Sequence, residues 1–240
     1  MPPSRSELLR SLHVPGEPLV LPNAWDVASA RAVVAAGFPV VATTSAGVAA
    51  VLGYEDHEGA PGEEMLGAAA RIASSVDVPV TVDAEAGYGL EPAELAGELE
   101  RIGAAGCNLE DTDHATGELR AAGAHAEWLR ALRETASELV INARVDVFLL
   151  QAGDLADALE RAQVYFEAGA DCVYPIGLVD SSAIGEFVAQ AEGPVNILAS
   201  PQAPPLGELA ELGVARVSYG SLLYRQTMEQ FTNLLTVMPR

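Results

Sequence analysis

The sequence contains no lysine, and its 13 basic residues are all arginine. Schiff-base chemistry on a carbonyl substrate requires a lysine amine, so a lysine-dependent aldolase is excluded. A phosphate-binding P-loop is excluded as well, because the lysine of that motif is missing. The absence of one residue type therefore removes two large functional classes.

Cysteine is almost absent too. Cys107 and Cys172 are the two that occur, and each lies in an apolar, strand-like run. Two cysteines cannot complete a zinc site, and no histidine lies at zinc-ligand spacing from either. We expect both side chains to be buried, reduced thiols.

Long apolar runs and positive charge are also scarce. Glycine or proline interrupts the longest apolar stretches before they reach the roughly 18 residues that a membrane span needs. The opening Met-Pro-Pro-Ser-Arg-Ser lacks the apolar core of a secretory signal. The net charge of −21 repels phosphate backbones and anionic lipid. We therefore expect a cytoplasmic protein with no nucleic-acid or membrane partner.

Strand and helix patterns alternate along the chain, and Gly37, Gly106, Gly169 and Gly213 each separate a helix from the next strand. This alternation predicts parallel strands joined by right-handed crossovers. About eight units in 240 residues match an α/β fold of the single (β/α)₈ TIM-barrel type, one domain over residues 1–240. A doubly wound sheet is the alternative, but no G-x-G-x-x-G follows the first strand.

The expected elements are as follows. Strands are predicted at 19–24, 39–45, 78–85, 107–111, 139–146, 171–177, 194–200 and 215–220. Helices are predicted at 6–12, 27–36, 63–76, 92–105, 125–136, 154–168, 182–191, 204–212 and 221–237. Residues 46–62 and 112–123 are expected to be irregular because they are polar or rich in turn residues.

The segment Val80-Thr-Val-Asp-Ala-Glu-Ala-Gly-Tyr-Gly89 carries two acids at the end of a predicted strand. Strand side chains alternate, so Asp83 and Glu85 are predicted to share a face. Two carboxylates on one face suit a hard cation such as Mg²⁺. The alternative is a polar strand end that meets solvent.

Other polar residues follow the remaining strands, and in a barrel they meet at the same end. Asp83, Glu85 and Glu110 could together hold one Mg²⁺, with Mn²⁺ as an alternative, partly through water. Arg144 offers a planar fork for a substrate carboxylate. Its alternative role is an ion pair with Asp146 or Glu110. The strand ends supply Asn23 and Trp25, Thr43 to Ser45, Asn108 to Asp111, Asn142, Arg144 and Asp146, and Asn196 and Ser200.

Several motifs, in order, resemble those of the isocitrate lyase/phosphoenolpyruvate mutase superfamily, in particular its phosphonomutase-like members. The resemblance extends from about Leu21 to Tyr224. Its motifs are Pro22-Asn-Ala-Trp-Asp26, Thr44-Ser-Ala-Gly-Val-Ala49, Val82-Asp-Ala-Glu-Ala-Gly-Tyr-Gly89, Asn108-Leu-Glu-Asp111, Ile141-Asn-Ala-Arg144 and Val214-Ala-Arg-Val-Ser218.

The resemblance implies a magnesium-dependent barrel that forms or breaks C–C or P–C bonds beside a 2-oxo carboxylate. It assigns the metal to Asp83, Glu85 and Glu110, although the family usually has Asp where this chain has Glu85. It implies that backbone groups at Ser45, Ala46 and Gly47 grip the substrate carboxylate, and that Asp56 and Arg144 act on the substrate. Trp25 and Asn196, at the ends of the first and seventh strands, complete the expected substrate-binding set.

The chain departs from its family after the fourth and sixth strands. The C–C lyases carry a segment with Lys and Cys after strand four, whereas this chain has Thr112-Asp-His-Ala-Thr-Gly-Glu-Leu119. The true mutase has Lys and Asn in that loop and a His after strand six, where this chain reads Tyr174-Pro-Ile-Gly177. Both usual routes are therefore disfavoured. The sequence names no single proton donor, and the candidates are His114 and Asp113 in the loop after strand four, together with Asp56 and His57.

For His57 and His114 a solvent-exposed loop position is the alternative, and His13 and His125 are expected to be structural. The predicted function is Mg²⁺-dependent cleavage of a bond next to the carbonyl of a small 2-oxo acid, through a metal-stabilised enolate. The alternatives are a phosphonomutase, a barrel that binds a 2-oxo acid without turnover, and a phosphate-binding barrel that uses residues 200–204 and 218–221. The resemblance also implies a homo-oligomer, a dimer or tetramer that exchanges the last helix.

Overall fold

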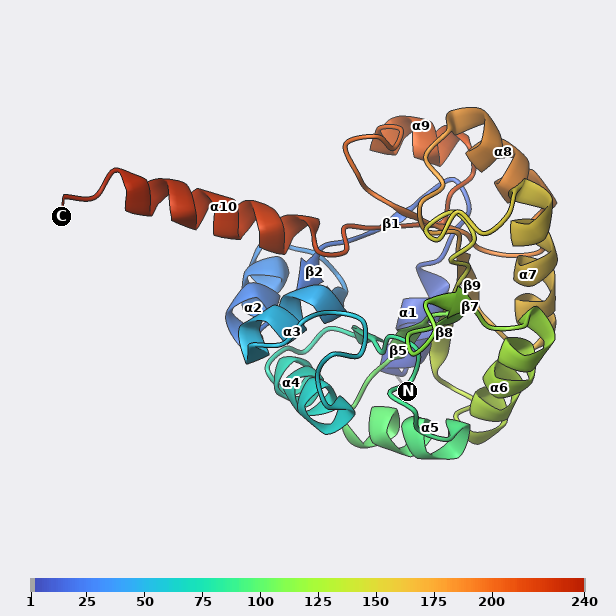
Figure 1. Cartoon of the computed structure of the whole chain (residues 1–240), viewed down its shortest axis with the longest axis horizontal. Helices are drawn as coiled ribbons and strands as arrows, with labels where there is room; N and C mark the ends of the chain where they lie inside the picture. The colour runs from blue at the N-terminus through green and yellow to red at the C-terminus, as the bar shows by residue number, and fades with distance from the viewer. Residues whose placement is uncertain (1–2, 240) are drawn as a thin grey trace.

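The computed structural model describes residues 3–239, so residues 1, 2 and 240 of the expected single domain lie outside it. Short parallel strands form the centre, and helices surround them (Figure 1). The strands are β1 (Leu19–Leu21), β2 (Asn23–Ala24), β3 (Val41–Thr43), β4 (Val80–Asp83), β5 (Gly106–Leu109), β6 (Thr112–Asp113), β7 (Glu118–Leu119), β8 (Val140–Arg144), β9 (Cys172–Tyr174), β10 (Asn196–Leu198) and β11 (Arg216–Ser218).

Helices alternate with these strands along the chain, as the sequence predicts. They are α1 (Arg5–Ser11), α2 (Val27–Ala35), α3 (Ser45–Leu52), α4 (Gly62–Ser74), α5 (Pro92–Arg101), α6 (Ala122–Thr135), α7 (Leu155–Glu167), α8 (Ser181–Gln190), α9 (Leu206–Glu211) and α10 (Leu222–Thr236).

The parallel strands form two sheets that continue into one another. One has the order β2-β3-β4-β5-β8-β9 and the other β1-β11-β10. A single parallel bridge between Val173 and Val195 connects β9 to the strand β10 region, and Pro22 alone separates β1 from β2. The prediction of an α/β TIM-barrel fold is confirmed.

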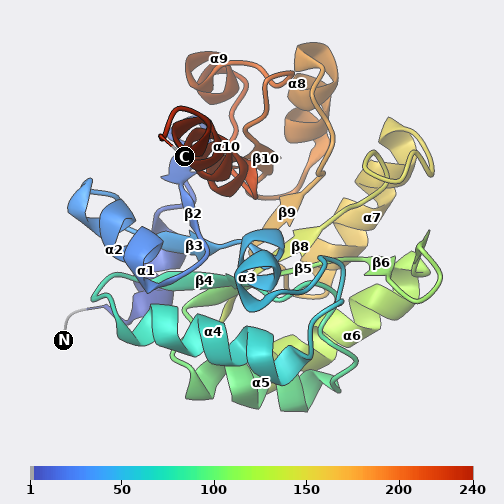
Figure 2. The same cartoon turned by 60° about the vertical axis from the view of Figure 1, so that its left-hand side comes forward.

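The core lies between the strands and the surrounding helices. Apolar residues of the strands, such as Val82, Leu109 and Ile141, pack against helix residues such as Leu95 and Leu129. A smaller cluster that includes Leu9 of α1, Leu21 and Val140 fills the amino-terminal end of the barrel. The opposite end, toward which the parallel strands point, is left to form a site. Figure 2 shows helices α4, α5 and α6 on the outside of the strands.

Three segments differ from the sequence-based expectation. Residues 46–62 begin with helix α3, whose sequence Ser45-Ala-Gly-Val-Ala-Ala-Val-Leu52 lacks the alternating polar and apolar faces that predict a helix. The expected loop 112–123 contains the antiparallel pair β6 and β7. The expected strand 78–85 ends at Asp83, two residues before Glu85.

Helix α10 does not lie against the barrel as the other helices do. It projects outward from the end of β11, and the C-terminal end of the chain lies far from the strands (Figure 1). No residue of α10 is buried. Within residues 3–239, no helix combines the length and the apolar character needed to cross a membrane.

The start of α2 provides a test of local stability. The Asp26 carboxylate accepts a hydrogen bond from Ser29 N at 2.7 Å, and Ser29 Oγ bonds back to Asp26 N at 3.0 Å. We expect Asp26→Ala to lower the free energy of unfolding by about 1 kcal/mol, because a free backbone donor loses its cap. Urea denaturation followed by circular dichroism measures this. Asp26→Asn, which can still cap, should stay near wild type; an equal loss in both variants would contradict the capping explanation.

Candidate active site

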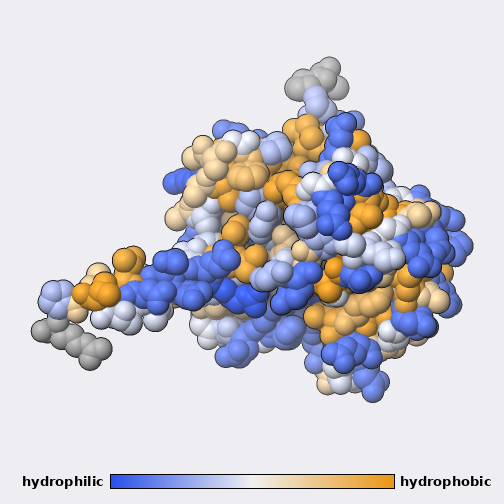
Figure 3. All heavy atoms as spheres, turned by 90° about the horizontal axis from the view of Figure 1, so that it is seen from above, coloured by the Kyte–Doolittle hydropathy of each residue, from blue (hydrophilic) through white to orange (hydrophobic). Residues whose placement is uncertain are grey.

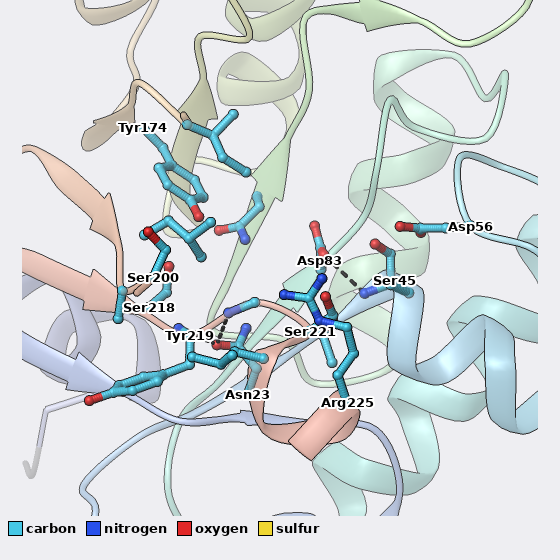
Figure 4. A pocket seen from close by; sticks show the side chains of 18 of the residues that line it. Asn23, Ser45, Asp56, Asp83, Tyr174, Ser200, Ser218, Tyr219, Ser221 and Arg225 are labelled. Carbon is cyan, nitrogen blue, oxygen red and sulfur yellow. Dashed lines mark hydrogen bonds between the residues drawn. The ribbon is translucent and has the colours of Figure 1, made fainter. Parts of the chain in front are cut away.

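A pocket of about 140 Å³ opens at the carboxyl ends of the strands (Figure 4). This volume is below the roughly 300–1,000 Å³ of sites for drug-sized ligands, so it suits a small molecule. Its walls come from seven strand ends, from α3 and from the base of α10. The lining residues are Asn23, Thr44, Ser45, Ala46, Asp56, Asp83, Asn108, Arg144, Tyr174, Ile176, Leu198, Ala199, Ser200, Pro201, Ser218, Tyr219, Gly220, Ser221, Leu222 and Arg225.

Asp83 ends β4 and is held from two directions. Its backbone N donates to Thr43 Oγ1 at 2.8 Å, and its Oδ2 accepts from Ser45 N at 2.9 Å. Its Oδ1 has no hydrogen-bond partner among residues 3–239. Burial, and then the negative charge of Glu110, raise the pKa of Asp83 to about 6. The side chain is therefore fixed in position with one oxygen free.

Asp56 reaches the same pocket from the segment between α3 and α4. Its Oδ1 is also buried and has no hydrogen-bond partner in the described part of the chain. Figure 4 shows Asp56 and Ser45 on the same side of the pocket as Asp83. Two carboxylates therefore face the cavity from one wall, each with a free oxygen.

Glu85 does not share the face of Asp83. Its φ of +48° breaks the strand alternation on which that expectation rested. The Glu85 carboxylate accepts from Glu58 N at 2.6 Å, and its carbonyl accepts from Glu110 N at 2.8 Å. Glu58 in turn accepts from Tyr88 N at 2.5 Å. Burial raises the pKa of Glu85 to about 7, and Glu85 does not line the pocket.

Several residues beside the site, in the segment after α3 and in the segment after β4, have positive backbone φ angles. His57, Glu58, Glu85 and Tyr88 all have positive φ, between +48° and +65°. Such conformations are uncommon for residues other than glycine and tend to gather at functional sites. The loop that carries Asp56 is thus tied to the end of β4 through Glu85.

Arg144 lies between two carboxylates under the pocket. Its Nη1 pairs with Glu110 Oε1, and its Nε and Nη2 donate to Asp146 at 2.9 and 3.1 Å. Burial alone would raise the pKa of Glu110, but Arg144 and His114 lower it. His114 Nε2 lies 2.9 Å from Glu110 Oε2. The alternative ion-pair role is therefore present in the structure, although Arg144 also reaches the pocket wall.

Asp146 is held in place by hydrogen bonds on the side away from the pocket. Its Oδ2 accepts from Thr112 Oγ1 at 2.6 Å, and its backbone N donates to Asp111 at 2.9 Å. Asp111 accepts from Tyr165 OH at 2.7 Å and from Arg161 at 3.0 Å. This chain of bonds ties Arg144 to helix α7.

The structure brings five of the predicted site residues together at the pocket: Ser45, Ala46, Asp56, Asp83 and Arg144. Glu85, Glu110 and His114 lie behind this first layer. Trp25 packs edge-on against Tyr224, and Gly47 sits beneath the Trp25 side chain. Asn196 is buried and bonds to Ser218.

The four histidines differ in their exposure to solvent. The His114 side chain is 9% exposed, so the solvent-exposed position considered for it is wrong. His57 is exposed, with its ring centroid 5.3 Å from that of His114. His13 and His125 are buried, and burial lowers their pKa to about 4 and about 3. Cys107 and Cys172 are buried and free, as predicted.

The sequence reasoning missed one pocket residue that matters for charge. Arg225 projects from α10 into the pocket (Figure 4). The position of polar residues at strand ends does not indicate Arg225, because Arg225 lies seven residues beyond Ser218, in helix α10. The signal that could have found it is its position one turn into the helix that follows the last strand.

A divalent cation fits this site in part. The free Oδ1 of Asp83 is the kind of ligand that Mg²⁺ takes, and Mg²⁺ usually keeps several waters and one or two carboxylates. No cluster of three or more His, Cys, Asp or Glu side chains within residues 3–239 could hold a metal ion. A cation here would therefore rest on Asp83, with Glu85 and Glu110 contributing through water or after rearrangement.

The fold and the pocket define the chain as a parallel (β/α) barrel with an acidic site at the carboxyl ends of its strands. Residues 9–238 match the family model described as phosphoenolpyruvate phosphomutase, and the chain belongs to that family. It is 38% identical over 214 residues to an uncharacterized protein of Mycobacterium tuberculosis, covering 89% of this chain and 81% of the relative.

Two further comparisons carry functional names. A protein of Corynebacterium glutamicum named as a probable 2-methylisocitrate lyase is 31% identical over 250 residues, covering 98% of this chain and 80% of the relative. A crystal structure from Burkholderia cenocepacia J2315, provisionally described as a phosphonomutase, is 41% identical with a TM-score of 0.92, covering 97% of this chain and 99% of that one. The family thus includes proteins named as lyases and as mutases.

The raised carboxyl pKa values predict how the metal-free protein responds to pH. Unfolded Asp and Glu titrate near 4, whereas Asp83 and Glu85 titrate at about 6 and about 7 in the folded chain. Between these values the folded state binds more protons than the unfolded state. The contribution of these two carboxyl groups to the free energy of unfolding is therefore fully present below pH 4 and is lost as the pH rises to about 7. We expect the urea midpoint, measured with a chelator present, to fall between pH 5 and pH 8.

The matched control is the Asp83→Asn/Glu85→Gln double variant, whose midpoint should change less over the same pH range. Asp111, with a pKa of about 6, keeps a residual slope in both proteins. An equal slope in wild type and double variant would contradict the assignment.

Proposed function

We propose that this protein is a divalent-metal-dependent enzyme that cleaves a bond next to the carbonyl of a small 2-oxo acid. The observation that supports this most directly is the geometry of Asp83. Its position is fixed by Ser45 N and Thr43 Oγ1, while Oδ1 stays free at the pocket. A carboxylate that is immobilised and yet unsatisfied suits a cation, and Mg²⁺ is the proposed one, with Mn²⁺ as a substitute.

The start of α3 is the proposed binding point for the substrate carboxylate. The first N–H groups of a helix have no partner within the helix. Ser45 N is used by Asp83, whereas Ala46 follows it along the pocket wall. Backbone amides at this helix start can donate to a carboxylate, and Arg144 adds positive charge nearby.

A bound Mg²⁺ would supply Lewis-acid polarisation of the substrate's carbonyl oxygen. The chain's own residues then have distinct roles. Asp56, with its free oxygen in the pocket, is the proposed proton carrier. Arg144 stabilises negative charge that develops on the substrate, and Glu110 and Asp146 hold the guanidinium in place. His114 orients Glu110 rather than touching the substrate.

A phosphonomutase reaction is the second candidate. The 41% identity to the Burkholderia protein supports it. The pocket's hydroxyl groups at Ser200, Ser218 and Ser221 are also suited to the oxygens of a phosphonate. A third candidate is binding of a 2-oxo acid without turnover.

Turnover of oxaloacetate, phosphonopyruvate and 2-methylisocitrate, each with and without Mg²⁺, separates these candidates. We expect Mg²⁺-dependent turnover of at least one, and Asp83→Asn should reduce both Mg²⁺ affinity and kcat/KM by more than about 100-fold. The reason is that even outer-shell partners of a metal contribute 10–100-fold. Asp77→Asn, an exposed aspartate before the same strand, is the matched control.

If a folded, metal-loaded protein turns over none of the three compounds, the proposed substrate class is wrong. Full activity in Asp83→Asn would remove the site assignment. Calorimetric binding of an acid without any product would favour the binding protein.

We also propose that the protein is a homo-oligomer in which α10 packs on a second copy. Met228, Phe231, Leu234 and Leu235 of α10 are exposed, and Phe231 is 52% exposed. Figure 3 shows α10 as an arm that leaves the body of the molecule, with apolar side chains toward its tip. An apolar stripe of this kind on a projecting helix indicates a protein partner. Because no residue of α10 is buried against its own barrel, we infer that a second copy of the chain is that partner.

Light scattering after gel filtration tests this. Wild type is expected at the mass of a dimer or tetramer, and Phe231→Glu should shift it toward the monomer because a charge enters the apolar contact. Asn233→Glu, which adds the same charge on the opposite side of α10, should keep the oligomer. A monomeric wild type would overturn the proposal.

A further inference from the structure

The pocket has two chemically different walls. Asp56 and Asp83 face it from one side, with the start of α3. Ser200 and Ser218 lie on the opposite side, whereas Ser221 and Arg225 lie below Asp83 in the view (Figure 4). Apolar side chains of Ile176, Leu198 and Leu222 also line the cavity.

The two arginines of the pocket differ in how their charge is balanced. Arg144 is paired with Glu110 and twice with Asp146. Within residues 3–239, Arg225 makes no ion pair and no side-chain hydrogen bond, so its fork of donors is available. The uncompensated positive charge of the pocket therefore belongs to Arg225 rather than to Arg144.

The base of α10 is held in place. Asn23 Oδ1 accepts from both Tyr219 N and Gly220 N at 2.9 Å, which ties the turn before the helix to β2. Tyr224, next to Arg225, packs edge-on against Trp25 with ring centroids 5.4 Å apart. The backbone at the base of α10 is therefore fixed, so only the side chain of Arg225 has to be ordered when it binds a ligand.

We propose that Arg225 is a specificity-determining residue that binds a second acidic group of the substrate, a carboxylate at the end remote from the 2-oxo acid. Arg225 meets this carboxylate as a planar fork, and the hydroxyl of Ser221 completes its contacts. The carbon chain between the two acidic groups lies along Ile176 and Leu198. The substrate is then a diacid. The placement of its 2-oxo end rests on the function proposed above, whereas the role of Arg225 does not.

Two stable ligands that differ in the remote carboxylate test this. Malate is a 2-hydroxy diacid, and lactate is the corresponding monoacid. Calorimetric titration with Mg²⁺ present is expected to show wild type binding malate at least about tenfold more tightly than lactate, as a charge-assisted bidentate contact provides. In Arg225→Gln the preference should vanish through loss of malate affinity, while lactate affinity stays within about twofold of wild type.

Arg31→Gln is the matched control, because it removes one exposed arginine from α2, outside the pocket. Arg225→Lys should recover part of the malate preference, since charge remains but the fork does not. An equal loss of malate and lactate affinity in Arg225→Gln would indicate a structural role and overturn the proposal. Absence of a malate preference in wild type would overturn it too.

The outcomes also separate this proposal from the proposed enzymatic function. If the preference for malate depends on Arg225 but no 2-oxo acid is turned over, the result supports Arg225 as the diacid contact and contradicts the proposed reaction. Turnover of a 2-oxo acid, with a malate to lactate ratio that Arg225→Gln does not change, supports the reaction and removes the role of Arg225.

Discussion

The buried guanidinium of Arg144 is the constraint on which the site depends. Burying a cation costs free energy unless carboxylates compensate it, and removal of one partner leaves an uncompensated buried charge. Glu110 and Asp146 are those partners, and Asp146 is fixed in turn by Thr112 and by Asp111. These residues come from β8, from the end of β5 and from the loop after it. The ion pairs of Arg144 with Glu110 and Asp146 therefore fix the relative positions of the ends of β5 and β8. Asp83 lies opposite Asn108 in the pairing of β4 with β5, so its position depends on the same arrangement.

Glu85 shows why a metal site and a loop contact can share one side chain. Its carboxylate is occupied by Glu58 N, and this bond keeps the segment that carries Asp56 against the end of β4. Burial raises its pKa to about 7, so below that pH the folded chain favours the protonated acid in the absence of a cation. A cation drawn toward Asp83 would favour the ionised form of Glu85. Loop position and cation binding are thus expected to act on each other through this residue, since any ligand that prefers one state shifts the population toward it.

Much of the architecture could be predicted from the sequence, because the alternation of strand and helix is periodic and the glycines that end helices are regular. Strand parity also placed Asp83 and Arg144 at the pocket. It failed at Glu85, since a left-handed residue ends the alternation and sequence alone does not reveal a positive φ outside glycine. The sequence does not indicate helix α3, because its residues are nearly all small or apolar and show no helical alternation of polar and apolar faces. Arg225 was missed because the principle applied, that site residues follow strands, does not extend to the inside of a helix. Whether Glu85 and Glu110 hold a metal depends on side-chain positions that pattern cannot give.

The position of Arg225 links two features that the sequence presents separately. It lies near the start of α10, a helix with no buried residue, whose base alone is fixed by Asn23 and Trp25. A second copy that covers the apolar stripe of α10 would restrict the helix along its length, and so would restrict the direction of Arg225. A diacid that engages Arg225 would restrict the same helix from the pocket side. Because coupling between two binding events is reciprocal, the acid must strengthen the association of α10 by the factor by which association strengthens acid binding. Under the proposed assembly and the proposed diacid contact, the projecting helix would connect substrate selection to association of the chains through the position of Arg225.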